Sequence, residues 1–215
     1  MALTSSSDYR ELCRADQVTL LDIARASIEL GLRTGQPPEI DLDTVAAELR
    51  RIQSSFVTLK IQQHLRGCVG SIDATRPLAS DVSRNAFAAA FQNVRFPKLR
   101  DYEFSLINIC VSVLSSQMPI ASRTLDEAIG GIRPGIDGVV IRCGERVATF
   151  LPQVWETLQD PIEFLRHLRL KAGLDPSSWP QGIQISTYTV QQFSQHAGDQ
   201  VDDVHRRTGS TASTI

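Results

Sequence analysis

Two alternating segments joined by a two-residue link constrain the fold of this chain more than any other feature. Residues 55–62 alternate, with every second residue from Val57 to Ile61 apolar, which is typical of a strand with one buried face. A second strand is expected from Leu65 to Ile72, after the link Gln63-His64. Because so short a link joins antiparallel strands, we predict a hairpin, although no glycine fixes its turn type.

Helical and strand patterns are interleaved irregularly along the rest of the chain. Apolar spacing and capping residues indicate helices, and alternation indicates further strands. The helices are expected at about 16–34, 44–51, 77–93, 124–130 and 160–173, and the strands at about 106–114, 139–143, 146–150 and 183–193. The sequence shows neither a repeat nor a glycine-rich phosphate loop after the first strand. This order favours an α+β fold with mixed or antiparallel sheets over a doubly wound sheet.

The chain of 215 residues is long enough to bury a large core, as one domain or as two small lobes. We expect residues 1–14 to form an N-terminal extension and residues 15–195 to form a single domain. Residues 196–215 offer little apolar surface, which predicts a disordered or loosely held tail.

The charge balance argues against a nucleic-acid or membrane-surface partner. Lysine and arginine total 22 and aspartate and glutamate total 24, so the formal net charge is −2. Such a chain has no global positive field that would attract nucleic acid or an anionic lipid surface. The N-terminus lacks the basic start and apolar run of a secretory signal, and no apolar stretch is as long as a membrane span. We therefore expect a cytoplasmic protein.

The four cysteines, Cys13, Cys68, Cys110 and Cys143, are single and widely spaced. They form no CxxC pair and have no nearby pair of histidines, so the zinc pattern is lacking. Reduced thiols in the cytoplasm fit best. We expect neither a metal nor another cofactor.

The segment Leu65-Arg66-Gly67-Cys68-Val69-Gly70 is the strongest candidate for function. Strand alternation predicts Arg66 and Cys68 on one face, where the arginine could favour a thiolate and hold a carboxylate or phosphate. The glycines around Cys68 would let a ligand approach the backbone. Alternatively, Cys68 is a small buried hydrophobe and the glycines mark a bulge, since no histidine is placed by sequence to act as its base.

Three polar residues outside this segment are also candidates. Asn85 lies on a helix expected to be largely buried, so its amide either ties a loop or faces a polar cavity. Arg95 follows the same helix and could bind an acid or anchor a loop. Lys171 skirts the apolar face of the last helix and is therefore expected to point inward.

The hexapeptide at 65–70, preceded by Phe56-Val57-Thr58-Leu59, resembles the signature of the AMMECR-type domain family, which includes the bacterial AmmeMemoRadiSam system protein A. Further segments match in the family's order, from about Asp16 to Phe193. They are Asn85-Ala86-Phe87-Ala88-Ala89-Ala90-Phe91, Arg95-Phe96-Pro97, Val111-Ser112-Val113-Leu114, Asp137-Gly138, Thr149-Phe150-Leu151-Pro152-Gln153-Val154 and Lys171-Ala172-Gly173-Leu174. An ordered series of this kind is far more specific than one motif.

The resemblance implies an α+β fold with a larger and a smaller lobe, and signature segments that meet near a cleft. It implies a Memo-like protein and a radical SAM protein as partners, and it brings no settled activity. The candidate roles of Thr149 and Gln153 rest mainly on it. One departure is Arg169, which stands where many relatives place a second cysteine and argues against a mechanism that needs a thiol there.

The leading hypothesis is a cleft-bearing protein, enzyme or not, that binds a small anionic or amide group around Arg66 and Cys68. Cys68 is the candidate catalytic residue. The candidate binding residues are Arg66, Gly67, Asn85, Arg95, Thr149, Gln153 and Lys171. The alternative is a protein-interaction module without chemistry, an accessory partner of a radical SAM or Memo-like system.

Overall fold

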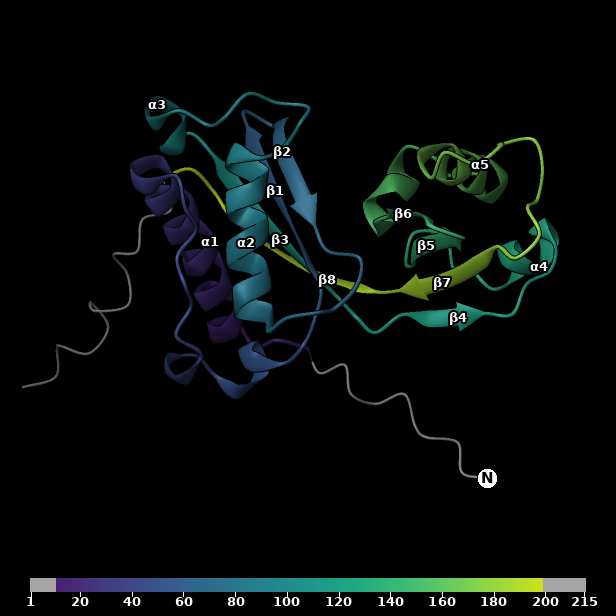
Figure 1. Ribbon diagram of the computed structural model, residues 1–215, viewed down its shortest axis with the longest axis horizontal. Coiled ribbons are helices and arrows are strands. Elements are labelled where there is room, and N and C mark those ends of the chain that lie inside the picture. The colour runs from purple at the N-terminus through teal and green to yellow at the C-terminus, as the bar shows by residue number, and fades with distance from the viewer. Residues whose placement is uncertain (1–10, 199–215) are drawn as a thin grey trace, which may run out of the picture.

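The computed structural model describes residues 11–198, which form two lobes (Figure 1). Each lobe contains a four-stranded sheet, and every strand pairing is antiparallel. The α+β prediction is therefore confirmed, with antiparallel rather than mixed sheets. Within residues 11–198, no helix has the length and apolarity needed to cross a membrane.

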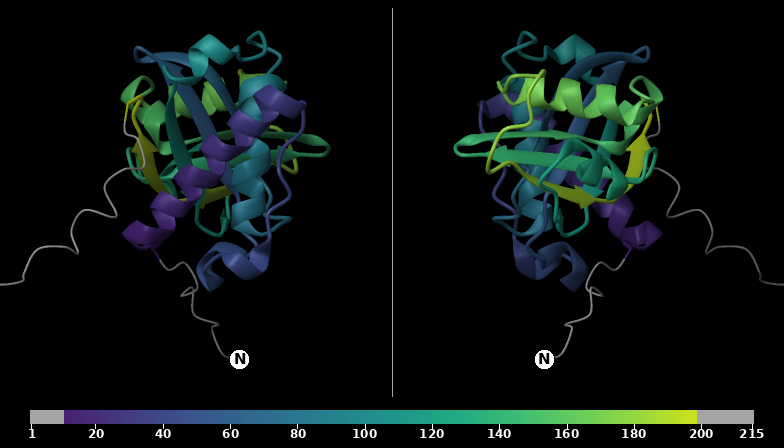
Figure 2. Two further views of the ribbon diagram at one scale, coloured as in Figure 1. Left: turned by 90° about the vertical axis from the view of Figure 1, so that its left-hand side faces the viewer. Right: turned by 90° about the vertical axis from the view of Figure 1, so that its right-hand side faces the viewer.

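The larger lobe carries the predicted hairpin, and its sheet has the strand order β2-β1-β3-β8. Its elements are α1 (Arg14–Thr34), η1 (Leu42–Thr44), η2 (Ala47–Arg50), β1 (Ser55–Ile61), β2 (His64–Gly70), α2 (Leu78–Phe91), α3 (Asp101–Phe104), β3 (Asn108–Leu114) and β8 (Val190–Gln195). Helices α1 and α2 cover the sheet face that lies away from the smaller lobe (Figures 1 and 2). Val57 and Leu59 of β1 point into that core, as the alternation predicts.

The smaller lobe has the sheet order β4-β7-β5-β6. Its elements are β4 (Met118–Ile120), α4 (Leu125–Gly130), β5 (Gly138–Cys143), β6 (Arg146–Phe150), η3 (Pro152–Glu156), α5 (Pro161–Lys171) and β7 (Gln184–Tyr188). Helix α5 begins where the sequence predicts, since the Asp160 carboxylate accepts a hydrogen bond from the Ile162 amide at 3.1 Å. Phe164 of α5 stacks on Trp155 of η3, with ring centroids 3.7 Å apart.

The last predicted strand, 183–193, is two strands that belong to different sheets. β7 completes the smaller sheet and β8 completes the larger one, with Thr189 between them. The chain also crosses between the lobes after β3, and the two crossings bond to each other at this point. The Ser115 amide donates to the Thr189 carbonyl and the Thr189 amide donates to the Ser115 hydroxyl, both at 2.9 Å. These bonds tie the lobes together.

Several local details differ from the sequence predictions. The hairpin turn is Gln62-Gln63, both with positive φ, so β2 begins at His64. The helical stretch predicted at 44–51 contains the last residue of η1 and all of η2, which are two separate 3₁₀ helices. Helix α1 begins before Asp16, whose carboxylate accepts a hydrogen bond from the Cys13 thiol. The short elements α3 and β4 were not predicted, because three or four residues carry too little periodicity.

The predicted domain limits, 15 and 195, lie next to the start of α1 and at the end of β8. Most of the predicted N-terminal extension and tail, residues 1–10 and 199–215, falls outside the described residues. Those two predictions stay predictions.

Candidate functional site

A β-bulge interrupts the signature hairpin at Arg66. Gly67 lies opposite Leu59, and Leu65 lies opposite Lys60, so Arg66 is the extra residue of β2. The simple two-residue alternation that placed Arg66 and Cys68 on one face is therefore broken at Arg66 itself.

The guanidinium of Arg66 binds the segment that follows α2. Its Nε and Nη2 donate to the two carboxylate oxygens of Glu103 at 2.7 and 2.9 Å. Its Nη1 donates to the Pro97 carbonyl at 2.9 Å, and Nη2 also lies 3.3 Å from the Lys98 carbonyl. The bond from Arg66 lowers the pKa of Glu103 below its ordinary value. All three guanidinium nitrogens are thus occupied within the protein, and Arg66 anchors residues 97–103.

The motif glycines allow close packing. A methyl group at Gly67 would overlap the carbonyl oxygen of Ala89 in α2, and one at Gly70 would overlap the ring of Phe56. Gly67 is buried against α2, and the close approach of this helix to β2 explains why the position needs a residue without a side chain.

Cys68 lies half-buried beside Thr58, on the sheet face that α1 and α2 leave uncovered. The Thr58 hydroxyl lies 3.3 Å from the Cys68 sulfur, within hydrogen-bond range. The Asn93 side chain donates to the Cys68 carbonyl at 2.9 Å and fixes the strand there. Cys110 lies on the other side of Thr58, and burial raises the pKa of its thiol, which disfavours a reactive thiolate at Cys110.

Lys171 is held at the end of α5 by contacts within the smaller lobe. Its ammonium donates to the Thr149 carbonyl at 2.9 Å and lies 5.1 Å from the centre of the Phe150 ring. Desolvation lowers its pKa and the charge of Arg95 lowers it further, whereas Cys68 acts in the opposite direction. Residue Lys171 is exposed when its whole surface is counted, but groups of both lobes act on its pKa. The charges that act on Lys171 thus include those of Cys68 and Arg95 in the larger lobe.

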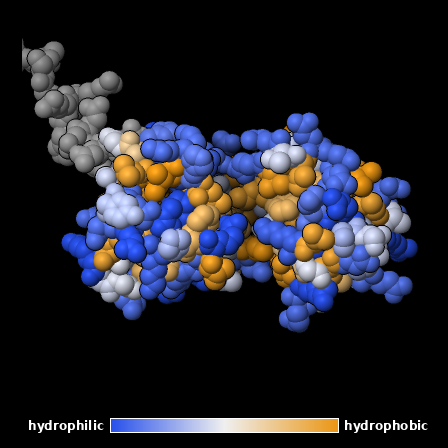
Figure 3. Space-filling model, turned by 90° about the horizontal axis from the view of Figure 1, so that it is seen from above, coloured by the Kyte–Doolittle hydropathy of each residue, from blue (hydrophilic) through white to orange (hydrophobic). Residues whose placement is uncertain are grey.

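The surface between the lobes is hollowed. Seen from the side of α3 and α5, the molecule narrows between the lobes, and hydrophobic residues gather there (Figure 3). Cations beside a partly desolvated cysteine suit an anionic ligand, because charge interactions strengthen where water is displaced.

The lowered pKa of Lys171 can be tested by titration. The chain has three lysines, Lys60, Lys98 and Lys171, so NMR of the ¹³C-dimethylated protein gives few signals. We expect the signal that disappears in Lys171→Met to titrate below the ordinary lysine value of about 10.4. Between the folded pKa of Lys171 and about 10.4, the unfolded chain binds more protons than the folded chain. The contribution of Lys171 to the free energy of unfolding therefore rises with pH in this range. A titration at or above about 10.4 would contradict the desolvated position.

Thr149 contributes its carbonyl to the site, while its side chain is buried. The Thr149 hydroxyl donates to the Val139 carbonyl at 2.9 Å and lies 2.6 Å from the Tyr188 hydroxyl. The Tyr188 hydroxyl also contacts the Phe150 carbonyl at 3.2 Å. Burial raises the pKa of Tyr188, so it stays protonated. These contacts position the corner that holds Lys171.

Asn85 belongs to a buried polar network with Ser55 and Asp81. Its amide donates to the Ser55 carbonyl at 3.0 Å and to the Asp81 carboxylate at 2.9 Å. The same Asp81 oxygen accepts from the amide and hydroxyl of Ser55. These contacts tie α2 to β1, whereas the sequence left open a tie to a loop or a polar cavity.

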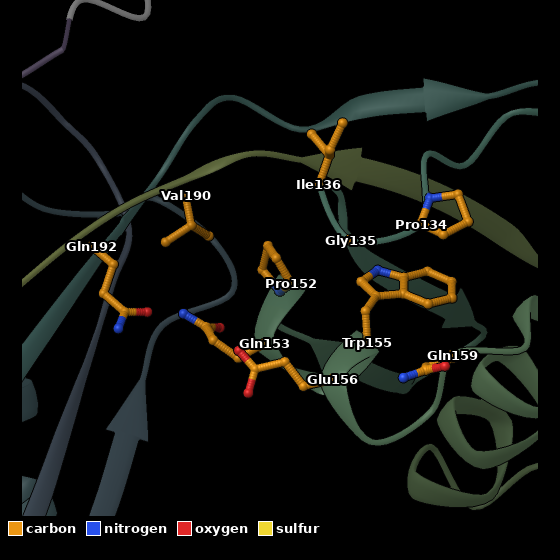
Figure 4. Close-up of a pocket in the computed structure, with 10 residues that line it drawn as sticks. All are labelled: Pro134, Gly135, Ile136, Pro152, Gln153, Trp155, Glu156, Gln159, Val190 and Gln192. Atoms are coloured by element: carbon orange, nitrogen blue, oxygen red, sulfur yellow. The ribbon is translucent and has the colours of Figure 1, made fainter.

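Gln153 lines a separate pocket between η3 and β8, with a volume of about 520 Å³. Figure 4 shows its side chain pointing toward Gln192 of β8, with Glu156 beside it. The Gln153 Oε1 atom is buried and has no hydrogen-bond partner among the described residues. It is the one predicted binding residue that opens onto this pocket.

Arg169 supports a loop. It is buried, and its Nη atoms donate to the Ser178 and Pro176 carbonyls at 2.6 and 2.8 Å. Burial lowers its pKa. Over residues 11–198, no three histidine, cysteine, aspartate or glutamate side chains are grouped so as to hold a metal ion.

Sequence reasoning missed Thr58, Asn93 and Glu103. The hairpin register could have identified Thr58, because it lies opposite Cys68. The contacts of Asn93 and Glu103 join segments 25 and 37 residues apart, and no local pattern predicts them.

Comparison with known proteins supports one family. A model of the AMMECR1 family matches residues 21–193. A protein of Methanothermobacter thermautotrophicus is 34% identical over 169 residues, covering 78% of this chain and 88% of that protein. A protein of Methanopyrus kandleri is 35% identical over 181 residues, covering 82% and 86%. The crystal structure of an uncharacterized protein from Pyrococcus horikoshii matches with a TM-score of 0.76 at 31% identity, covering 83% of this chain and 91% of that chain. The chain belongs to the AMMECR1 family.

Proposed function

We propose that the cleft between the lobes binds a small anionic group through Arg95 and Lys171, next to the thiol of Cys68. The observation that carries this proposal is the position of Lys171, which the Thr149 carbonyl holds at 2.9 Å and where burial and the charge of Arg95 lower the lysine pKa. A carboxylate or phosphate between the two cations would replace the water that Lys171 loses. The cytoplasm, which keeps thiols reduced, is the compartment that suits Cys68.

The sharper form of the proposal is an enzyme that uses Cys68 as a nucleophile. The Cys68 thiol would first give its proton to a base, and the thiolate would then add to a carbonyl carbon of the bound anion, with the C=O π electrons moving onto the carbonyl oxygen. No histidine supplies that base from the hairpin, but Lys171 has a lowered pKa and can hold a proton near the thiol. In this proposal Lys171 acts as the base, for which the sequence offers no histidine.

Anion binding tests this proposal. We expect phosphate or malonate to shift the dimethyl-lysine signal of Lys171 with saturation. Arg95→Gln should weaken binding by about fivefold or more, as expected for loss of a charge-assisted contact. Arg84→Gln, an exposed cation on α2, is the charge-matched control and should change nothing. Lack of saturation, or equal losses in the two variants, would refute the anion site.

A second candidate function is an interaction module that recruits a Memo-like or radical SAM protein. It is favoured by apolar side chains exposed along residues 93–106, where Val94 is 100% exposed and Tyr102 71% exposed. If this function holds, Val94→Asp with Tyr102→Ser should abolish co-purification with such a partner, while Cys68→Ser should preserve it. Retained co-purification in the double variant would count against the module.

A further inference from the structure

We propose that the pocket between η3 and β8 is a second binding site, and that it takes an ammonium or guanidinium group carried on an apolar stem. It has its own lining residues and does not depend on the anion site at Cys68. The lining residues come from both lobes, with Val190 and Gln192 on β8 and the rest on the smaller lobe (Figure 4).

The walls of this pocket are held in place by the protein itself. The Asp137 carboxylate accepts hydrogen bonds from the Arg133 amide at 2.8 Å and from Arg133 Nη2 at 2.6 Å. These bonds close the turn that carries Pro134, Gly135 and Ile136. The Trp155 indole donates to the Asp137 carbonyl at 2.8 Å, which docks the turn on η3. A pocket with fixed walls loses less entropy when a ligand binds.

The apolar part of the lining suits an alkyl stem. The apolar side chains of the lining are Pro134, Ile136, Pro152, Trp155 and Val190. Ile136 is 52% exposed, although it sits on a fixed turn. Contact with a methylene chain would remove that surface from water and favour binding.

The polar part of the lining calls for hydrogen-bond donors and positive charge. Its one ionisable residue is Glu156, and none of the ten lining residues is a lysine, arginine or histidine. The Gln153 Oε1 atom is a buried acceptor without a partner in the described chain, and such a group gains most from a donor. Figure 4 shows the ends of Gln153, Glu156 and Gln192 converging on one side of the pocket. Ammonium and guanidinium groups match this set because they only donate.

The volume of about 520 Å³ is that of a typical small-ligand pocket. It would accept either a free alkyl amine or guanidine, or a lysine or arginine side chain of a peptide. The chemistry is the same for both sources, so the test contains an arm for each.

Isothermal titration calorimetry of the full chain tests this inference with four probes. They are butylguanidinium, its neutral analogue butylurea, the blocked peptide acetyl-Ala-Arg-Ala-amide and the same peptide with citrulline. Saturable binding of butylguanidinium would indicate that the site takes a free alkyl guanidine. If only the arginine peptide binds, the site takes a side chain of a peptide. In either case the neutral analogue should bind about tenfold more weakly or worse, because it lacks the charge. The indole N–H signal of Trp155, assigned with Trp179→Phe, should shift as the site fills.

Three variants locate the binding. Glu156→Gln should weaken binding of the charged probe by about fivefold or more. Gln153→Met keeps the side-chain length and should also weaken binding of that probe. Glu145→Gln, an exposed carboxylate on the β5–β6 turn, should leave the dissociation constant unchanged. The inference is overturned if neither charged probe saturates, if the neutral analogue binds equally well, or if both pocket variants bind like the wild type.

Discussion

Gly67→Ala is expected to destabilise the protein by about 3 kcal/mol, at the upper end of the usual cost of overpacking. The added methyl group would overlap the carbonyl oxygen of Ala89. A side chain could rotate away, but this oxygen belongs to the backbone of α2, which is packed in the core of the larger lobe. Relief therefore requires a shift of the whole helix. Urea unfolding should show a lower midpoint with an unchanged slope.

Substitutions at two other glycines serve as comparisons for the stability of Gly67→Ala. Gly130→Ala is the matched control, because the new methyl group has no atom within 4 Å, and we expect stability to stay equal or to rise slightly. Gly70→Ala should fall between the two, since the obstacle is the ring of Phe56. If Gly67→Ala were as stable as Gly130→Ala, the close approach of β2 to α2 would be wrong.

Arg66→Met is expected to destabilise the protein by about 2–3 kcal/mol at neutral pH, because it leaves a largely covered carboxylate without its charged partner and two carbonyl groups without their donor. The side chains of Arg66 and Glu103 are only 12% and 13% exposed. The ion pair also fixes residues 97–103 on the hairpin.

The pH dependence of this effect has a definite sign. Arg66 depresses the pKa of Glu103 in the folded protein. The resulting stability is present above the unfolded value of about 4.3 and is lost as pH falls through the lower folded pKa. The gap in unfolding free energy between wild type and Arg66→Met should therefore be widest at neutral pH and shrink in acid.

Arg166→Met is the matched control for the Arg66 prediction. Arg166 pairs with Glu163 at 2.7 Å, but the two side chains are well exposed, and surface pairs contribute little. We expect no measurable change in stability. Equal effects of Arg66→Met and Arg166→Met would contradict the anchoring role of Arg66.

The sequence predicts the elements of this fold well where the signal is local. The alternation at 55–62 and the short link after it sufficed for the hairpin, and the Asp160 cap located α5. The bulge at Arg66 was not predictable, because it depends on how β1 and β2 pair, with Arg66 then anchored to Glu103. Likewise, the split of the last strand at Thr189 arises because its halves join different sheets.

The candidate site itself stays a prediction. Of the predicted binding residues, Lys171 has a pKa on which Arg95 and Cys68 act, and Gln153 faces the pocket beside η3. Arg66, Asn85 and the Thr149 side chain are engaged by protein groups, and Gly67 packs on α2. A polar residue in a signature segment can bind a ligand or another part of the chain, and sequence alone does not distinguish the two uses.

The central claim, that Lys171 of one lobe acts on Cys68 of the other, is tested most directly by the rate of iodoacetamide labelling of native protein, resolved for each cysteine by mass spectrometry. A nearby ammonium favours the thiolate, so Lys171→Met should slow labelling of Cys68 by about threefold to tenfold near pH 7.5. Labelling of Cys143, on β5, should keep its rate. Equal Cys68 rates in the two proteins, or a Cys68 that stays unlabelled in the native wild type, would contradict the claim.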